Sequence, residues 1–183
     1  MAHKIIKRLS NEKAVTLIEV IVSLVLAGIM AAVVGLGLVK ITQSYVFAKQ
    51  NSETVQKAQI AMTRIVKELG AAEPQTGAAA ITAAGPTSVS YTRRDPIGSS
   101  TFISNTISIS GGLVQMSGNA SGTLINNVVT NSSSFAYFDA AGTTLSAPVT
   151  VAKIRRIDVT LNVTGAGNQT STFKNSVWIN ESY

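Results

Sequence analysis

The sequence contains no cysteine and only one histidine, His3. The absence of cysteine excludes a disulfide framework, a thiolate metal site and a catalytic thiol, but it does not exclude an oxidising compartment. Beyond His3 the chain lacks the commonest metal ligand and proton shuttle. It also lacks a glycine-rich phosphate loop and a cluster of carboxylates. The sequence therefore predicts a protein that is not an enzyme and that holds no metal and no cofactor.

Aromatic residues make up 5% of the chain and charged residues 13%, and the net charge is +6. The first 13 residues carry half of this net charge, because they contain four basic side chains and one acidic residue, Glu12. The other half is spread among charges of both signs. A nucleic-acid surface normally needs a denser basic stripe. The overall charge therefore gives little support to nucleic acid as a partner.

Charge is absent altogether between Val20 and Val39. The apolar run that contains this stretch, residues 16–39, is long enough to cross a bilayer as a helix. The basic residues ahead of it place residues 1–14 in the cytoplasm and the C-terminal part of the chain outside. A cleavable signal peptide is the competing interpretation, but it would need a cut after Ala32, where the residues fit poorly. We predict a transmembrane segment over 16–39.

One carboxylate, Glu19, interrupts this apolar run near its start. A glutamate in hydrocarbon costs several kcal/mol unless it has a partner or a function. The favoured interpretation is that Glu19 pairs with a positive charge at the same depth. The alternative is that it lies at the membrane interface and reaches water.

The helical pattern continues beyond the apolar run as an amphipathic stripe. Its apolar positions recur at spacings of three and four, at Val55, Ala58, Met62, Ile65 and Leu69. Proline is absent from residues 15–73, Gly70 is a plausible C-cap and Pro74 follows. We predict one helix over 15–70, after a leader at 1–14.

The remaining residues, 71–183, predict a β-rich head. Residues 71–86 are typical of a loop with one short strand. Alternating apolar and polar residues then predict strands near Val89–Tyr91, Ile107–Ile109, Leu113–Met116, Phe135–Phe138, Ile157–Val163 and Phe173–Ile179. Gly111-Gly112 indicates a two-residue hairpin turn, Asp139–Gly142 a turn and Gly165–Gln169 a loop. The predicted fold class is α+β, with a largely antiparallel sheet whose apolar face is covered by the amphipathic half of the helix.

The motif Lys13-Ala14-Val15-Thr16-Leu17-Ile18-Glu19, followed by an apolar helix, resembles the class III signal of type IV pilins and type II secretion pseudopilins. The resemblance implies that prepilin peptidase cuts between Ala14 and Val15 and methylates the new Val15 amine. It also implies storage in the inner membrane, and assembly with other pilin or pseudopilin subunits by an inner-membrane platform into a periplasmic pseudopilus or a cell-surface pilus. This chain departs from the usual pattern, which has Gly before the cut, Phe after it and a proline late in the span.

Cleavage would place the Val15 amine four residues from Glu19, at the same membrane depth. Opposite charges stabilise each other strongly in a low dielectric, and pairing across subunits would fix the axial register. The family implication agrees that Glu19 guides docking. Three C-terminal segments, Phe135–Gly142, Ile154–Leu161 and Ser176–Asn180, resemble J-type minor pseudopilins and W-type minor pilins. Together these features predict a structural, minor subunit.

A second hypothesis is a binding module at the filament tip, an adhesin or DNA receptor. Its contacts would come from basic residues of the head: Arg93, Arg94, Arg155 and Arg156. Because the last two border an alternating strand, one of them is expected to face solvent without a partner. A third hypothesis, a membrane-tethered enzyme, predicts activity in the head alone. Asp139 beside Gly142 is a candidate calcium ligand, but a plain turn is the favoured interpretation there.

Overall fold

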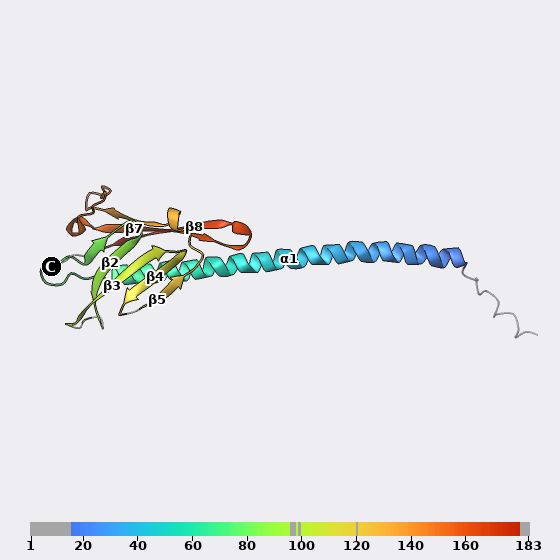
Figure 1. The fold of residues 1–183 in the computed structure, drawn as a ribbon, viewed down its shortest axis with the longest axis horizontal. Helices are drawn as coiled ribbons and strands as arrows, with labels where there is room; N and C mark the ends of the chain where they lie inside the picture. Colours follow the sequence, from blue (N-terminus) through green and yellow to red (C-terminus); the bar gives the residue numbers. More distant parts are fainter. Residues whose placement is uncertain (1–15, 96–97, 99, 120, 180–183) are drawn as a thin grey trace, which may run out of the picture. The chain divides into compact units, whose positions relative to one another are not determined.

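The computed structural model describes residues 16–95, 98, 100–119 and 121–179. It contains one long helix, α1 (Leu17–Gly70), followed by strands (Figure 1). These are β1 (Ile81–Ala84), β2 (Ser88–Arg94), β3 (Phe102–Ser110), β4 (Leu113–Gly118), β5 (Gly122–Ile125), β6 (Ser134–Phe138), β7 (Arg156–Thr164) and β8 (Thr170–Trp178). Short 3-10 helices lie at η1 (Thr130–Ser132), η2 (Val151–Lys153) and η3 (Ala166–Asn168).

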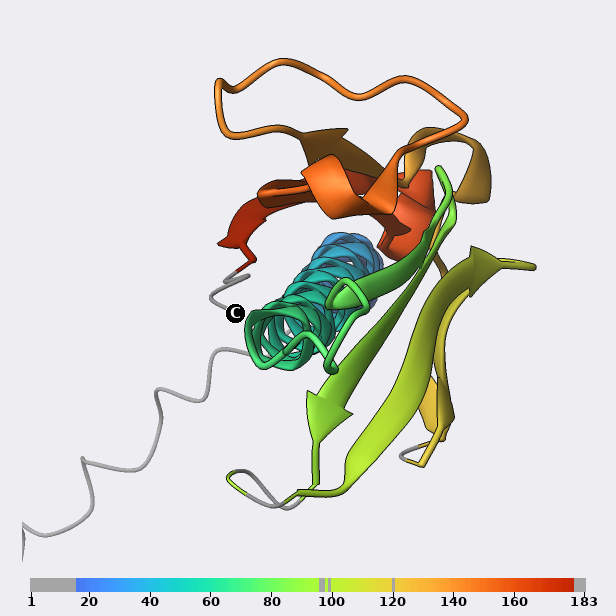
Figure 2. The same cartoon turned by 90° about the vertical axis from the view of Figure 1, so that its left-hand side faces the viewer.

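The chain divides into two compact units, residues 1–46 and 47–183. The described part of the first unit is the apolar part of α1. The second unit contains the amphipathic part of α1 and all the strands. The two antiparallel sheets lie on two sides of the C-terminal turns of the helix (Figure 2). This α+β architecture is pilin-like, and it confirms the predicted fold class.

The larger sheet has five strands in the order β1-β2-β3-β4-β5, so every strand pairs with its sequence neighbour. The predicted hairpin joins β3 to β4. Its two turn residues have positive φ, 57° at Gly111 and 75° at Gly112. A two-residue turn that matches the twist of its strands needs positive φ at both positions, which glycine adopts without steric cost.

The smaller sheet has three strands in the order β6-β7-β8. The alternation predicted for the central strand is confirmed, because Ile157, Val159, Leu161 and Val163 are all fully buried. The division of the strands into two sheets was not predicted. Nor was β5, whose four residues, Gly-Thr-Leu-Ile, show no alternation of apolar and polar side chains.

The core of the second unit lies between the amphipathic part of α1 and the two sheets. The helix buries Ala58, Ala61, Met62, Ile65 and Leu69. The predicted stripe is therefore confirmed except at Val55, which is only half-buried, while Ala61 joins the buried set. Complete burial of a side chain such as Ile65 or Leu69 stabilises the fold by about 2 kcal/mol. This packing holds α1 to the head.

Two buried tyrosines connect elements of the head. The Tyr91 hydroxyl of β2 donates to Glu68 Oε2 of α1 at 2.9 Å. The Tyr137 hydroxyl of β6 donates to the Gly85 carbonyl, ahead of β2, at 2.8 Å. Burial raises the pKa of both phenols above the ordinary value of 10, and the hydrogen bond to Glu68 raises that of Tyr91 further.

These raised pKa values predict alkaline instability of the fold. Below about pH 10 the phenols are protonated in both states, so their contribution is fully present there. Above that pH only the unfolded state loses the protons, and the free energy of unfolding falls by up to about 1.4 kcal/mol per pH unit for each tyrosine. Urea unfolding of the full chain in detergent micelles, between about pH 9 and about pH 11, measures this slope.

The Tyr91→Phe and Tyr137→Phe variants are expected to flatten the alkaline slope, although each loses about 1 kcal/mol at neutral pH with its hydrogen bond. The matched control is Tyr45→Phe, because Tyr45 is exposed on α1. An equal slope in wild type and in the Tyr91→Phe/Tyr137→Phe double variant would contradict the prediction.

Candidate functional site

Glu19 lies in the first turn of α1. Its backbone N–H lies 3.4 Å from the Thr16 hydroxyl oxygen and 3.0 Å from the Thr16 carbonyl oxygen. Thr-x-x-Glu at a helix start is the pattern of a capping box, in which the threonine hydroxyl accepts from the glutamate N–H. Our sequence analysis missed this role, although the spacing of Thr16 and Glu19 is its signal. The donor in both contacts is the Glu19 backbone N–H, so this capping role belongs to the Thr16 side chain and does not use the Glu19 carboxylate.

The helix terminus does not by itself balance the charge of Glu19 in hydrocarbon. A carboxylate near a helix N-terminus gains about 0.3–1 kcal/mol from the helix dipole. Placing that carboxylate in hydrocarbon costs several kcal/mol, so the second effect is larger. Within residues 16–179 as described, no basic side chain forms an ion pair with it. In hydrocarbon the carboxylate would therefore need a positive partner from outside these residues, whereas at the membrane interface it would reach water.

The apolar part of α1 leaves its side chains exposed all around the helix. Among the described residues, α1 is the one helix that is long and apolar enough to cross a membrane. An exposed apolar surface of this extent indicates contact with lipid or with other helices. The most exposed large side chains of this apolar part are Leu17, Ile18, Leu24, Met30, Val33, Val34, Leu36, Leu38, Ile41 and Tyr45.

The predicted cleavage site, Ala14 and Val15, lies outside the described residues. Cleavage between these residues and methylation of Val15 therefore stay predictions. Thr16, the next residue, is described, and α1 begins directly after it.

The arginine pair at the end of β2 has acidic partners within the second unit. Arg93 Nε lies 3.3 Å from Glu68 Oε2, and its Nη1 lies 3.8 Å from Asp95 Oδ1. Arg94 Nε lies 2.6 Å from Glu73 Oε2. Both pairs join β2 to residues at or just beyond the end of α1, so both arginines have structural roles.

The second arginine pair, at the start of β7, is also engaged. Arg155 Nη1 donates to the carbonyls of Ala152 at 3.0 Å and Ile154 at 2.9 Å. Arg156 Nε lies 3.0 Å from Asp158 Oδ1. The expectation that one of the two arginines faces solvent without a partner was wrong. Sequence alternation predicts which way a side chain points but not which acceptors the tertiary fold brings to it.

Arg156 also brings together the three C-terminal segments that carried the resemblance to minor subunits. It stands between Phe138 and Trp178 in the register of the three-stranded sheet. Its guanidinium carbon lies 4.0 Å from the centre of the Phe138 ring and 5.7 Å from that of Trp178. Cation–π contacts of this kind contribute about 0.5–1 kcal/mol at exposed sites. We name these three residues the aromatic–arginine cluster.

Asp139 forms a turn. Its Oδ1 accepts the backbone N–H of Ala141 at 2.9 Å and of Thr143 at 2.8 Å. The Gly142 N–H also donates to the Asp139 carbonyl at 3.1 Å. In the described ranges, no three acidic or histidine side chains gather closely enough to hold a metal ion.

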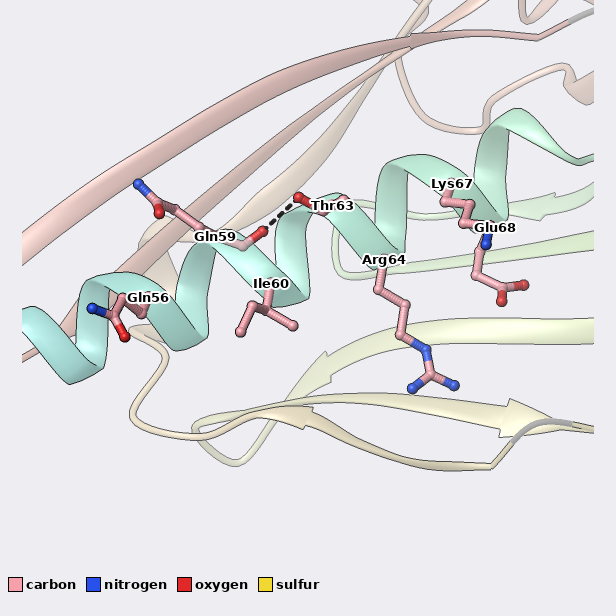
Figure 3. Close-up of a pocket in the computed structure, with 7 residues that line it drawn as sticks. All are labelled: Gln56, Gln59, Ile60, Thr63, Arg64, Lys67 and Glu68. Atoms are coloured by element: carbon pink, nitrogen blue, oxygen red, sulfur yellow. Dashed lines mark hydrogen bonds between the residues drawn. The ribbon is translucent and has the colours of Figure 1, made fainter.

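A shallow groove runs along the solvent side of α1 in the second unit (Figure 3). All seven residues that line it come from this one helix: Gln56, Gln59, Ile60, Thr63, Arg64, Lys67 and Glu68. The Thr63 hydroxyl donates to the Gln59 carbonyl at 2.8 Å. The Glu68 carboxylate accepts from the Tyr91 hydroxyl and forms an ion pair with Arg93. Because no second element supplies converging polar groups, the groove lacks the features of a ligand site.

Residues 9–35 match the family model described as the prokaryotic N-terminal methylation motif. None of the curated proteins compared with the chain matches it. The matched residues include the predicted cleavage site, Glu19 and most of the apolar run, up to residue 35. The chain thus carries the class III signal of type IV pilins ahead of a long helix and a pilin-like β head, a combination that supports a type IV pilin or pseudopilin precursor.

Proposed function

We propose that this chain is a structural, minor subunit of a type IV pilus or type II secretion pseudopilus. The observation that carries the proposal is Glu19, a carboxylate without an ion-pair partner among the described residues, at the start of an exposed apolar helix. The methylation motif at residues 9–35 coincides with this feature. A helix of this kind needs both an apolar environment and one positive charge, and a bundle of like subunits supplies both.

The proposed processing creates that positive charge. Prepilin peptidase cuts between Ala14 and Val15, and the new Val15 amine is methylated but keeps its charge. In the assembled filament this amine pairs with Glu19 of an adjacent subunit. In a low dielectric such a pair is strongly attractive, while either charge left alone is costly. Subunits therefore stabilise each other only at the axial offset that brings the two groups together.

Before assembly the same helix holds the subunit in the inner membrane, with the head outside the cytoplasm. An inner-membrane platform then moves it into the filament. Minor status rests on the resemblance of the C-terminal segments to J-type and W-type subunits. One residue from each of those three segments meets in the aromatic–arginine cluster, so the segments form one contiguous part of the three-stranded sheet.

The alternative, a tip module that binds a surface or DNA through arginines of the head, gains no support from the geometry. Arg93, Arg94 and Arg156 pair with acidic side chains, and Arg155 donates to backbone carbonyls. A phosphate would have to displace these partners. The arginines also lie on different sheets, at the ends of β2 and β7.

Intact mass and N-terminal sequence, from cells with and without prepilin peptidase, test the processing step. We expect a mature chain that begins at methylated Val15 only when the peptidase is present. Ala14→Leu should reduce cutting at least about tenfold, because the position before the cut needs a small side chain. Ala32→Leu, within the apolar run, is the matched control and should leave the cut unchanged.

The opposite pattern would overturn the proposal. A chain that begins near Val33, blocked by Ala32→Leu and not by Ala14→Leu, would show an ordinary signal peptide and a secreted head. An uncut chain in the presence of the peptidase would leave a membrane-tethered protein that is not processed as a pilin.

A further inference from the structure

Three of the four sheet edges in the head are short or covered, and one is not. The outermost strands of the five-stranded sheet, β1 and β5, have four residues each and an irregular register. The outer side of β6 is occupied, because Phe135 N–H donates to the Pro86 carbonyl and the Tyr137 carbonyl accepts from Leu145 N–H, both at 2.8 Å. By contrast, β8 has nine residues in unbroken register with β7. Natural proteins usually shield edges of this length, because they accept further strands.

The backbone of β8 presents a row of hydrogen-bonding groups away from the sheet. The backbone N–H and C=O of Asn162 in β7 point away from β8, because the N–H donates to the Ser133 hydroxyl oxygen and the C=O accepts from Val129 N–H. Its partner in register is Thr172. The alternation of an antiparallel ladder therefore directs the N–H and C=O of Thr172, Lys174 and Ser176 outward.

These outward residues are accessible. All three are exposed, and in the part of the chain that the structure describes no other strand pairs with this edge of β8. Among the described residues, the one hydrogen bond within the protein to these outward backbone groups is that of Ser176 N–H to Asn175 Oδ1, at 2.8 Å. The edge thus offers a ladder of donors and acceptors that a second extended chain would satisfy at the two-residue spacing of a strand.

Two side chains on one face of β8 indicate which side chains the added strand would need. Trp178 is 65% exposed although it belongs to the aromatic–arginine cluster. Exposed tryptophan beside arginine is typical of the residues that dominate protein interfaces. Four residues away on the same face, Lys174 is the single charge of β8. An apolar side chain opposite Trp178 and an acidic one opposite Lys174 would complement this face.

We propose that the outer edge of β8 binds an extended segment of another protein, which adds to the three-stranded sheet as a fourth strand. The segment carries an acidic residue four positions from an apolar one. A second copy of this chain fits less well, because symmetric pairing about the middle of β8 would set Lys174 opposite itself, and like charges directly opposite destabilise a sheet. This inference does not rest on the proposed filament function.

Trp178 provides a direct measurement, because it is the only tryptophan in the sequence. The probe is a synthetic peptide as long as β8, made of threonine and serine with one glutamate four positions from one leucine. Titrated into the full chain in detergent micelles, it should shift the Trp178 emission to shorter wavelength. A peptide with lysine in place of the glutamate should bind about fivefold more weakly.

Methylated peptides separate backbone pairing from side-chain contact. In antiparallel pairing with the glutamate opposite Lys174 and the leucine opposite Trp178, the amides of these two peptide residues and of the residue midway between them face β8. N-methylation of these three should weaken binding by at least about tenfold. N-methylation of the intervening amides, which face away, is the matched control and should have little effect.

Substitutions of Lys174 in the protein test the same contacts. Lys174→Glu should reverse the preference, so that the lysine peptide binds more tightly than the glutamate peptide. Lys174→Thr removes the charge and keeps the outward N–H, whereas Lys174→Pro removes both. Binding should therefore be weakest for Lys174→Pro, with circular dichroism confirming that each variant remains folded.

Three results would overturn the proposal. Equal binding of the two methylated peptides would exclude a backbone ladder. A Lys174→Glu variant that still prefers the glutamate peptide, or the absence of any emission shift up to about 1 mM peptide, would exclude the proposed segment. An emission shift that follows protein concentration without peptide would identify a second copy as the occupant.

Discussion

The Glu19→Gln variant is expected to be cut and methylated normally but to enter filaments at least about 100-fold less than wild type. Breaking a buried ion pair by removing one partner costs about 3–5 kcal/mol, because the other charge is left uncompensated. Since each 1.4 kcal/mol changes an equilibrium about tenfold, this cost is a loss of about 100-fold or more in docking. The measurement is the amount of subunit in sheared filaments relative to the amount in the membrane.

Glutamine is the informative substitution because it separates docking from helix capping. The Thr16–Glu19 capping pattern accepts either glutamate or glutamine, so Glu19→Gln keeps the cap and removes only the charge. Thr16→Ala does the reverse, and we expect it to cost about 1 kcal/mol of helix stability with little effect on incorporation. Glu53→Gln, at an exposed position of the same helix, controls for the loss of a carboxylate elsewhere on α1.

The capping role alone would produce a different pattern. If Glu19→Gln assembles like wild type while Thr16→Ala does not, assembly depends on the helix cap made by Thr16, and the docking proposal is wrong. If both variants assemble normally, the carboxylate reaches water at the membrane interface and needs no partner.

The Glu68→Ala variant is expected to lower the free energy of unfolding of the head by about 3 kcal/mol. Glu68 is the acceptor for the Tyr91 hydroxyl at 2.9 Å and lies 3.3 Å from Arg93 Nε, so one carboxylate joins α1 to β2 twice. The side chains of Glu68 and Arg93 are each only 16% exposed. Removal of the carboxylate therefore leaves a largely buried guanidinium and a buried hydroxyl with fewer partners. Urea unfolding of the full chain in micelles measures the difference.

A neighbouring ion pair is the matched control. Glu73 lies 2.6 Å from Arg94, closer than the Glu68 pair, but its side chain is 46% exposed. Exposed pairs contribute about 0–1 kcal/mol, so Glu73→Ala should change stability far less despite the shorter distance. Equal losses in the two variants would contradict the view that burial decides the effect.

A double variant identifies the origin of the loss at Glu68. Glu68→Leu/Arg93→Leu removes both charges, and it should recover much of the stability lost in Glu68→Ala, because no buried charge is left unpaired. A double variant that is less stable than Glu68→Ala would show that Arg93 stabilises the head through other contacts, such as the one with Asp95 at 3.8 Å.

The features that sequence alone predicted correctly are those with a local physical cause. An apolar run without proline predicts a helix, and the spacing of Ala58, Met62, Ile65 and Leu69 identifies the face that it buries. Gly111-Gly112 predicts the hairpin, because glycine adopts the positive φ that the turn requires. The class III signal is likewise contiguous, so it is readable without a structure. Even the helix cap at Thr16, which we missed, was visible in the spacing of Thr16 and Glu19.

What only the tertiary structure decided depends on residues far apart in the chain. Arg93 meets Glu68 across 25 positions of sequence, and no periodicity predicts that pairing. The same holds for the division of the strands into two sheets, and for the meeting of Phe138, Arg156 and Trp178 in one register. The exposed edge of β8 is also a tertiary property. An alternating sequence shows which side chains point inward, but whether a strand lies in the middle or at the edge of a sheet depends on the strands that pack beside it.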